Sequence, residues 1–415
     1  MWSPRPIVML VHVKMLGCIA FASSTRGGGR FPDCPTTDHD MYINIIVSSG
    51  LLFKFLQIIS SFSFFLVSLF GFCNFHDRKA LRLKINRTRP SMVWLRRVIL
   101  FLSVVCSVVS ARCTTPGQRK AWHTLSNSEK QAYIDAELCL MRKPPKTAFK
   151  GVITRFDDFQ ALHVHTAYMN HYVGAFLPFH RLMTYSHEAA LREECGYKGY
   201  QPYWYEQMDA GKFSSSDIFD SVYGFGGNGF GREGCITDGP FANYTSPFGP
   251  GSEIRTQCID RNFDDAVSLG TSRARVEDCT SKPNWISAWN CIELNPHGGG
   301  HNGVGGQMAR GGASPGDPIF FLHHAWIDKL WWDWQAKDLP ARLSEMGGTN
   351  FDENSGFPPG PPDYPQPGAM PGDPGNITTL NHVLFMFGTM GDDKIIADVM
   401  DIQGDFLCYG YVDPE

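Results

Sequence analysis

Histidines at short, regular spacings are the residues of this sequence best suited to chemistry. They fall into two groups of three: His163, His171 and His180, then His297, His301 and His324. His297 and His301 stand four apart, so one turn of helix places both imidazoles on one face. Nine of the 14 histidines lie within residues 163–187 and 297–324. Such clustering favours two sites that each gather three imidazoles.

Neutral imidazoles packed together need a partner for their ring nitrogens, and a metal ion can supply it. A single histidine is more often a hydrogen-bonded core or surface residue, but two matched groups are poorly explained that way. Zinc often recruits a carboxylate or thiolate beside histidine, and one zinc would leave the second group unexplained. Copper accepts imidazole and cycles between two oxidation states. We therefore expect two copper ions, which could oxidise a diphenol with dioxygen.

The elements that must position the first group are helical in pattern. A capping box at 126–129 opens a helix that stops at Pro144, and we interpret this helix as scaffold. A second helix, 157–170, carries both His163 and His165, and helical phase alone cannot choose between them. Pro178 fits the first position of a third helix, which carries His180 and ends near residue 196.

The second group follows a long irregular stretch. Helical periodicity is lost from 211 to 272 and returns at 297–308, although three consecutive glycines weaken that first turn. A turn at 314–318 launches a Trp-rich helix over 319–337, whose tryptophans we expect in the core. A Pro/Gly-rich connector at 347–375 precedes short strands. The pattern predicts a mainly α fold, with an antiparallel four-helix core, long loops and minor β structure.

Charge and cysteine content limit the partners and the cellular compartment that we expect for the protein. The formal net charge is −4, but residues 1–111 carry 13 basic and 4 acidic residues, leaving 24 basic and 37 acidic residues for 112–415. An acidic globule of this kind is not expected to bind nucleic acid or an anionic membrane. Eight cysteines remain from Cys113 onward, an even number typical of disulfides in an oxidising compartment, and their pairing is open.

A complete secretory signal peptide lies inside the chain, at 92–111. It begins at Met92 and has a short basic region with Arg96 and Arg97. An apolar run at 98–109 follows, and small residues end it. The simplest account is that translation starts at Met92, and that 1–91 is a gene-model extension or disordered. A membrane anchor at 56–72 is the alternative. Sequons at Asn243 and Asn376 are consistent with secretion of 112–415.

Two longer motifs resemble the tyrosinase family, which includes catechol oxidases and shares its metal site with hemocyanins. The stretch HYVGAFLPFHR at 171–181 resembles the first copper motif, and Glu188 also matches. The stretches at 302–308 and at 314–328, the latter reading SPGDPIFFLHHAWID, resemble the second. The likeness covers nearly all of 112–415 and is greatest to short secreted fungal members.

The resemblance implies a role for each histidine. The first copper ion would be held by His163, His171 and His180, and the second by His297, His301 and His324. His163 is favoured over His165 because it stands at the family position. His323 is expected beside the ligands rather than among them. Asp328, four residues past His324, is expected either to orient that imidazole or to form a surface ion pair.

Departures from the family pattern narrow the expected activity. Met169 replaces the cysteine that crosslinks to the second histidine in many members. Gly298 stands where strong monophenol hydroxylases carry Asn, and Glu293 lies off the usual position of the glutamate that works with it. We therefore expect oxidation of o-diphenols or o-aminophenols, with a roomy entrance at Gly298 rimmed by the loops 211–272 and 347–375.

Two other functions stay open. A tailoring oxidase of a fungal secondary-metabolite pathway, acting on a phenol or on the tyrosine of a small peptide, would use the same copper pair. A hemocyanin-like carrier of dioxygen would also use it, although the chain is short for that role.

Overall fold

The computed structural model describes residues 7–15, 39–47, 84–86, 113–250, 252–357, 364–366 and 370–414. Contacts divide the chain into two units, 1–109 and 110–415. In the first unit, β1 (Ile7–Met15), β2 (His39–Val47) and β3 (Lys84–Asn86) form an antiparallel sheet in the order β2-β1-β3. The segments 56–72 and 92–111 lie outside the described residues, so the predicted anchor and signal peptide stay predictions. Among the described residues, no helix combines the length and the apolar character needed to cross a membrane.

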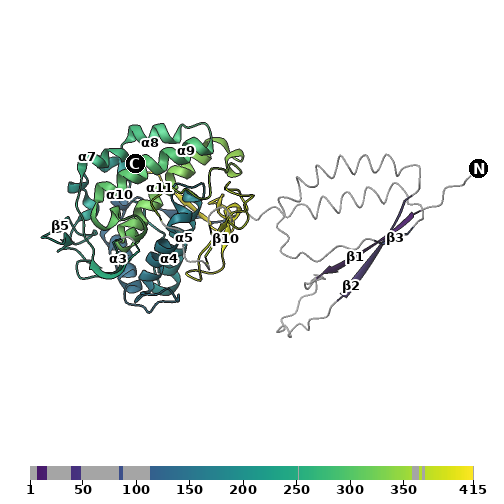
Figure 1. The fold of residues 1–415 in the computed structure, drawn as a ribbon, viewed down its shortest axis with the longest axis horizontal. Coiled ribbons are helices and arrows are strands. Elements are labelled where there is room, and N and C mark those ends of the chain that lie inside the picture. Colours follow the sequence, from purple (N-terminus) through teal and green to yellow (C-terminus); the bar gives the residue numbers. More distant parts are fainter. Residues whose placement is uncertain are drawn as a thin grey trace, which may run out of the picture. The chain divides into compact units, whose positions relative to one another are not determined.

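The second unit is built around a group of long helices (Figure 1). They are α3 (Asn127–Leu140), α4 (Arg155–Asn170), α5 (Phe176–Cys195) and α11 (Ile319–Gln335). Helix α5 packs against the other three. Trp326, Trp331 and Trp334 of α11 are fully buried, as expected of a core helix. The predicted mainly α fold with a helical core is confirmed.

The ends of these helices follow from local sequence. Ser126 and Glu129 form the predicted capping box of α3, and Thr154 and Asp157 form another at the start of α4. Gly196 ends α5 with a left-handed φ of 72°, which glycine adopts without a steric penalty. The predicted start of α5 is off by two residues, because Pro178 lies in the first turn, where its missing N–H is not needed.

Two helices before the second histidine group were not predicted. They are α8 (Arg273–Thr280) and α9 (Trp285–Ile292), and a disulfide between Cys279 and Cys291 joins them. Each is only eight residues long, which is too short for the helical periodicity to be recognised in the sequence. The chain then passes through a π-helical turn (Glu293–His297) directly into α10 (Gly298–Val304).

The remaining elements are short. They are β4 (Gly117–Arg119), α6 (Glu206–Asp209), β5 (Gly229–Phe230), β6 (Cys235–Ile236), β7 (Thr245–Phe248), β8 (Ile254–Cys258), α7 (Asp265–Ser268), β9 (Val383–Leu384), β10 (Lys394–Ile395) and β11 (Tyr409–Tyr411). Strand β11 pairs in parallel with β4, while β5–β6, β7–β8 and β9–β10 are antiparallel. The predicted minor β structure is therefore present.

Disulfides tie the irregular segments, as predicted. The four bonds are Cys113–Cys408, Cys139–Cys195, Cys235–Cys258 and Cys279–Cys291. Cys113–Cys408 joins the two ends of the second unit, and Cys235–Cys258 closes the loop that sequence alone marks as irregular. All eight cysteines from Cys113 onward are paired.

Candidate metal centre

The structure gathers the histidines into two groups. In the first, a ring nitrogen from each of His163, His171 and His180 lies within 4.8 Å of the others. The second group meets the same condition with His297, His301, His324 and the adjacent His323. The first group comes from α4, α5 and the loop between them, and the second from the π-helical turn that ends at His297, from α10 and from α11.

The two groups adjoin each other. The imidazoles of His180 and His324 stack with ring centroids 4.2 Å apart and planes 10° apart, so α5 and α11 bring the groups together. His165 is absent from the first group, because its ring stacks on Phe149 with centroids 4.9 Å apart. The geometry therefore brings His163, and not His165, to the centre.

Backbone carbonyls fix the orientation of the first-group rings. The Nδ1 atoms of His171 and His180 lie 2.9 and 2.8 Å from the carbonyl oxygens four residues earlier, and Nδ1 of His163 lies 2.8 Å from Gly312 O. A carbonyl only accepts, so each Nδ1 carries the proton and each Nε2 keeps a lone pair. In the second group, Nδ1 of His301 lies 2.6 Å from Met308 O, and Nδ1 of His297 lies 3.1 Å from Glu293 O.

These lone pairs face one another. Nε2 of His163 lies 3.1 Å from Nε2 of His180. Burial lowers the pKa of both rings well below its usual range, with neighbouring histidines lowering it further, so both stay neutral near pH 7. Two facing lone pairs repel unless a cation lies between them. The donor set of the first group thus fits a metal ion that accepts neutral nitrogen, as copper and zinc do.

The second group fits a metal ion in the same way. Nε2 of His301 lies 3.2 Å from Nε2 of His324, and the buried Nε2 of His297 has no hydrogen-bond partner. Burial lowers the pKa of His301 to about 4 and that of His297 and His324 well below its usual range. Two ions, one at each group, would satisfy these nitrogens.

The three glycines between His297 and His301 each have a different neighbour. A Cβ at Gly298 would meet only Glu293 O, at 3.7 Å, so this position opens to free space. A Cβ at Gly299 would come within 2.9 Å of the Gly270 backbone. At Gly300 it would come within 2.4 Å of the His323 ring. The glycines that weaken the helix in sequence therefore allow close packing in the fold.

A cavity of about 250 Å³ reaches both groups, with His171 of the first group and His297, Gly298 and His301 of the second in its wall. Phe357 closes the side nearer the first group, where its ring centroid lies 4.9 Å from that of His171. The prediction that both loops rim the entrance is wrong in part. Phe357 belongs to the connector 347–375, but none of the residues lining this cavity comes from 211–272. Residues of that loop, such as Gly270, pack instead against Gly299 of α10.

The proteins similar to this chain agree with this geometry. The family model "Common central domain of tyrosinase" matches residues 153–337. Tyrosinase-like protein phomQ1 of Diaporthe leptostromiformis is 34% identical over 79% of this chain and 90% of its own length. The chain belongs to the tyrosinase family. It is therefore an oxidoreductase of a family whose members hold a dicopper centre.

Other members of the family are also similar. N-acetyl-6-hydroxytryptophan oxidase ivoB of Emericella nidulans is 31% identical over 71% of this chain and 91% of its own length. A solved polyphenol oxidase of Thermothelomyces thermophila superposes with a TM-score of 0.64 at 28% identity, covering 77% of this chain and 94% of that one.

Asp328 lies in a buried network of this tyrosinase-family domain rather than against His324. Its carboxylate accepts from Nε of Arg181 at 2.5 Å and from the hydroxyls of Tyr409 and Tyr411, each at 2.5 Å. Nδ1 of His324 has no partner among the described residues. Neither role considered for Asp328, orienting His324 or pairing on the surface, describes this position.

Glu188 belongs to the same network. Its carboxylate accepts from Nε of Arg119 at 2.9 Å and from the backbone N–H of Gln201 at 2.8 Å. Arg119 in turn lies over the Tyr409 ring, 3.6 Å from its centroid. The network thus joins β4, α5, α11 and β11, and it supports the helices that carry the histidines.

Sequence reasoning placed Glu293 off the site, but the structure puts it in the cavity wall. Its carboxylate accepts from the backbone N–H of Tyr172 at 2.6 Å and from Nε1 of Trp289 at 2.7 Å. Burial raises the pKa of Glu293 to about 8, against the lowering effect of these two N–H donors. Tyr172 follows the ligand candidate His171 and has a φ of 57°, a strained conformation for a residue other than glycine. Glu293, four residues before His297 of the second group, therefore holds the backbone next to the first group.

Glu206 is the second glutamate that sequence alone missed. It lies in the one-turn helix α6, fully buried, with Oε1 2.5 Å from Nδ1 of His323. Burial raises the pKa of Glu206 well above its usual range. His323 lies beside the candidate ligands as expected, and 117 residues separate it from its carboxylate partner.

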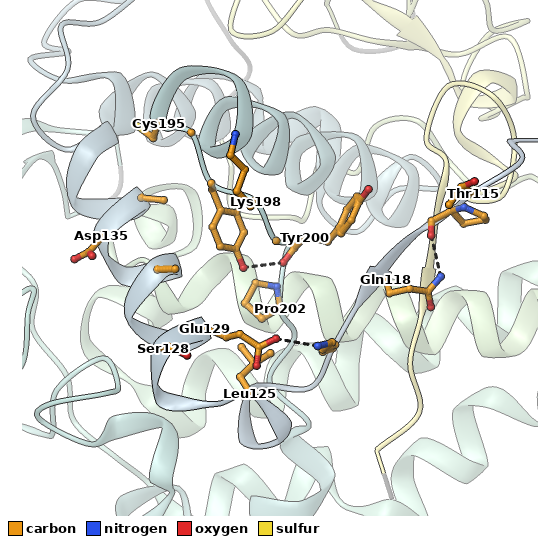
Figure 2. A pocket seen from close by; sticks show the side chains of 17 residues that line it. Thr115, Gln118, Leu125, Ser128, Glu129, Asp135, Cys195, Lys198, Tyr200 and Pro202 are labelled. Carbon is orange, nitrogen blue, oxygen red and sulfur yellow. Dashed lines mark hydrogen bonds and ion pairs between the residues drawn. The ribbon is translucent and has the colours of Figure 1, made fainter.

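A larger groove, of about 720 Å³, lies away from both histidine groups (Figure 2). It runs between α3, the segment around β4 and the turn after α5. Its polar groups pair among themselves, as Lys120 with Glu129 at 2.9 Å and the Tyr197 hydroxyl with Tyr200 O at 3.2 Å. The smaller cavity at the histidines is therefore the candidate site.

Proposed function

We propose that this chain is a copper-dependent oxidase that converts o-diphenols or o-aminophenols to quinones. Two molecules of diphenol give up four electrons and four protons, and one dioxygen becomes two molecules of water. The convergence of two three-imidazole groups, with their Nε2 lone pairs aimed inward, is the observation that carries this proposal.

The residues of the chain would hold the two metal ions, orient the imidazole rings and enclose the centre. His163, His171 and His180 would hold one copper ion, and His297, His301 and His324 the other. When bound, the copper pair supplies dioxygen binding and the exchange of two electrons. The carbonyl bonds to Nδ1 fix the rings before the ions arrive, and the aromatic side chains of Phe176 and Phe320 exclude water around them.

A second candidate is a tailoring oxidase acting on a larger phenol or on a peptide tyrosine. The open position at Gly298 favours it, since no side chain there limits a bulky substrate. The relative named as an N-acetyl-6-hydroxytryptophan oxidase also supports a substrate larger than a simple catechol. Monophenol hydroxylation is not part of the first proposal, because Gly298 replaces the Asn expected of strong hydroxylases, whereas action on a peptide tyrosine would require it.

We further propose secretion and N-glycosylation. The four disulfides support an oxidising compartment. Of the two sequons, Asn243 is exposed. The Asn376 amide oxygen accepts from Thr349 Oγ1 at 2.7 Å and from the Asn350 backbone N–H at 3.0 Å, so Asn376 also holds the connector.

The test is to load the secreted protein with copper and offer catechol, tyrosine and a tyrosine-containing peptide. Under dioxygen we expect the near-ultraviolet absorption band of a coupled copper pair, and rapid formation of coloured quinone from catechol. Faster turnover of the peptide would favour the tailoring role. Reversible oxygenation without quinone formation would support a carrier instead, and a copper-loaded protein without the band would contradict the proposal.

A further inference from the structure

We propose that Glu206 and His323 form a support pair that positions the second histidine group, so that retention of the metal ion there depends on Glu206. The inference rests on the proposed function, since it concerns the second of the two copper ions. In this role Glu206 acts through His323 and touches neither the substrate nor the metal.

The support pair is fully buried and has no alternative partner among the described residues. Both side chains have 0% exposure, and Oε1 of Glu206 lies 2.5 Å from Nδ1 of His323. No lysine or arginine within the described part of the chain pairs with Glu206, and its other oxygen, Oε2, has no hydrogen-bond partner. A buried carboxylate of this kind is costly unless a nearby positive charge offsets it, and a metal ion at the second group would do so.

His323 transmits this contact to the candidate ligands. Its ring packs edge-on against His301, with centroids 4.6 Å apart and planes at 75°, and its centroid lies 5.5 Å from that of His297. It also precedes His324, whose Nδ1 has no partner of its own. The orientation of His324 therefore depends on packing against neighbours such as His323, 4.9 Å away between centroids.

The chain makes room for the support pair. A Cβ at Gly300, between His297 and His301, would lie 2.4 Å from the His323 ring and 2.6 Å from Oε2 of Glu206. The backbone N–H of Trp204 donates to Leu322 O at 3.0 Å, which ties the segment before Glu206 to the residue before His323. The pair thus joins α6 to α11 and lies against Gly300 of α10.

The experiment compares three variants of the copper-loaded protein. Glu206→Gln keeps the volume and one acceptor oxygen but cannot carry a charge. Glu206→Ala removes the volume and the acceptor as well. The matched control is Asp209→Asn, in the same turn of helix. Asp209 is also buried, but it accepts from Trp204 Nε1 at 2.9 Å and from Ser216 Oγ at 2.5 Å, and among the described residues it forms no hydrogen bond with a histidine. Copper per chain is measured during dialysis against a chelator, together with the electron paramagnetic resonance spectrum and the melting temperature.

We expect the Glu206 variants to lose the second copper ion about 10–100-fold more readily than the parent, as is usual when a residue behind a metal ligand is changed. The copper ion that remains would give the resonance signal of an isolated cupric ion, which a coupled pair does not show. Asp209→Asn should melt earlier yet keep both ions. Equal retention in Glu206→Gln and the parent would overturn the inference, as would loss of both ions in step. A parent protein that never binds two copper ions would instead sink the proposed function.

Discussion

The two histidine groups are alike in composition but are held differently. In the first group, all three Nδ1 atoms bond to backbone carbonyls. In the second group, two do so, while Nδ1 of His324 has no partner within the described part of the chain and its neighbour His323 is held by Glu206. The first group is therefore fixed by the backbone and the second partly by side-chain packing.

Their surroundings differ in the same sense. Both groups line the cavity, but the Phe357 ring packs on His171 of the first group, whereas Gly298 places no side chain over the second group. Buried glutamates, Glu206 and Glu293, lie close to the second group. We therefore expect side-chain changes to tune the second group more than the first.

Removing one imidazole from either group should have the largest effect and should not distinguish them. We expect His171→Ala and His301→Ala each to lose more than about 100-fold in quinone formation, since changes behind a ligand alone cost about 10–100-fold. Each variant should retain copper at the intact group. Oxidase assays and copper analysis check this, and substantial activity in either variant would show that the ring is not a ligand.

Acid should destabilise the metal-free protein through both groups alike. Burial lowers the pKa of His171 and of His301 to about 4, so between pH 6.5 and 4 the unfolded chain binds more protons than the folded one. Stability is full above about pH 6.5 and falls as the pH drops towards 4, by roughly 3 kcal/mol for each ring.

Urea unfolding of the metal-free protein across this range measures the effect. The slope should weaken in His171→Gln and in His301→Gln to a similar extent. An unchanged slope in only one of them would show that the two groups differ in burial after all.

Glu293→Gln should affect both groups, because this side chain joins them. The amide can accept from only one of Tyr172 N–H and Trp289 Nε1–H, and the other donor then faces an NH₂ group. We expect a loss of about 1–3 kcal/mol in the free energy of unfolding, with reduced activity.

The control is Glu277→Gln on the exposed face of α8, which should stay within about 0.5 kcal/mol of the parent. Denaturant titration compares the two variants. Equal stability of both would show that Glu293 does not hold Tyr172.

The smallest effects are expected from the glycines of the second group, where the direction changes between neighbours. Gly300→Ala should cost about 1–3 kcal/mol, because its Cβ overlaps the His323 ring. Gly298→Ala should be neutral or stabilising by up to about 1 kcal/mol, since alanine favours helix and meets only one atom, at 3.7 Å. Melting temperatures report both, and the opposite order would refute the packing described for Gly300.

Much of the helical framework could be predicted because its signals are local. The capping box at Ser126, the stop at Gly196 and the Trp-rich helix before Lys337 depend on residues within a few positions of each other. The short helices α8 and α9 escaped prediction because eight residues give too little periodicity to be recognised.

By itself, the sequence determined which residue types meet at the centre. It offers six imidazoles, two of them four residues apart, on or next to helices whose ends can be predicted from local sequence. Only the tertiary structure decided that His163 rather than His165 points inward, that Asp328 serves a buried network, and that Glu206 and Glu293 reach segments 117 and 121 residues away. The physical reason is that spacing and capping are properties of neighbouring residues. The choice of a buried partner depends instead on how distant segments pack, which no local pattern encodes.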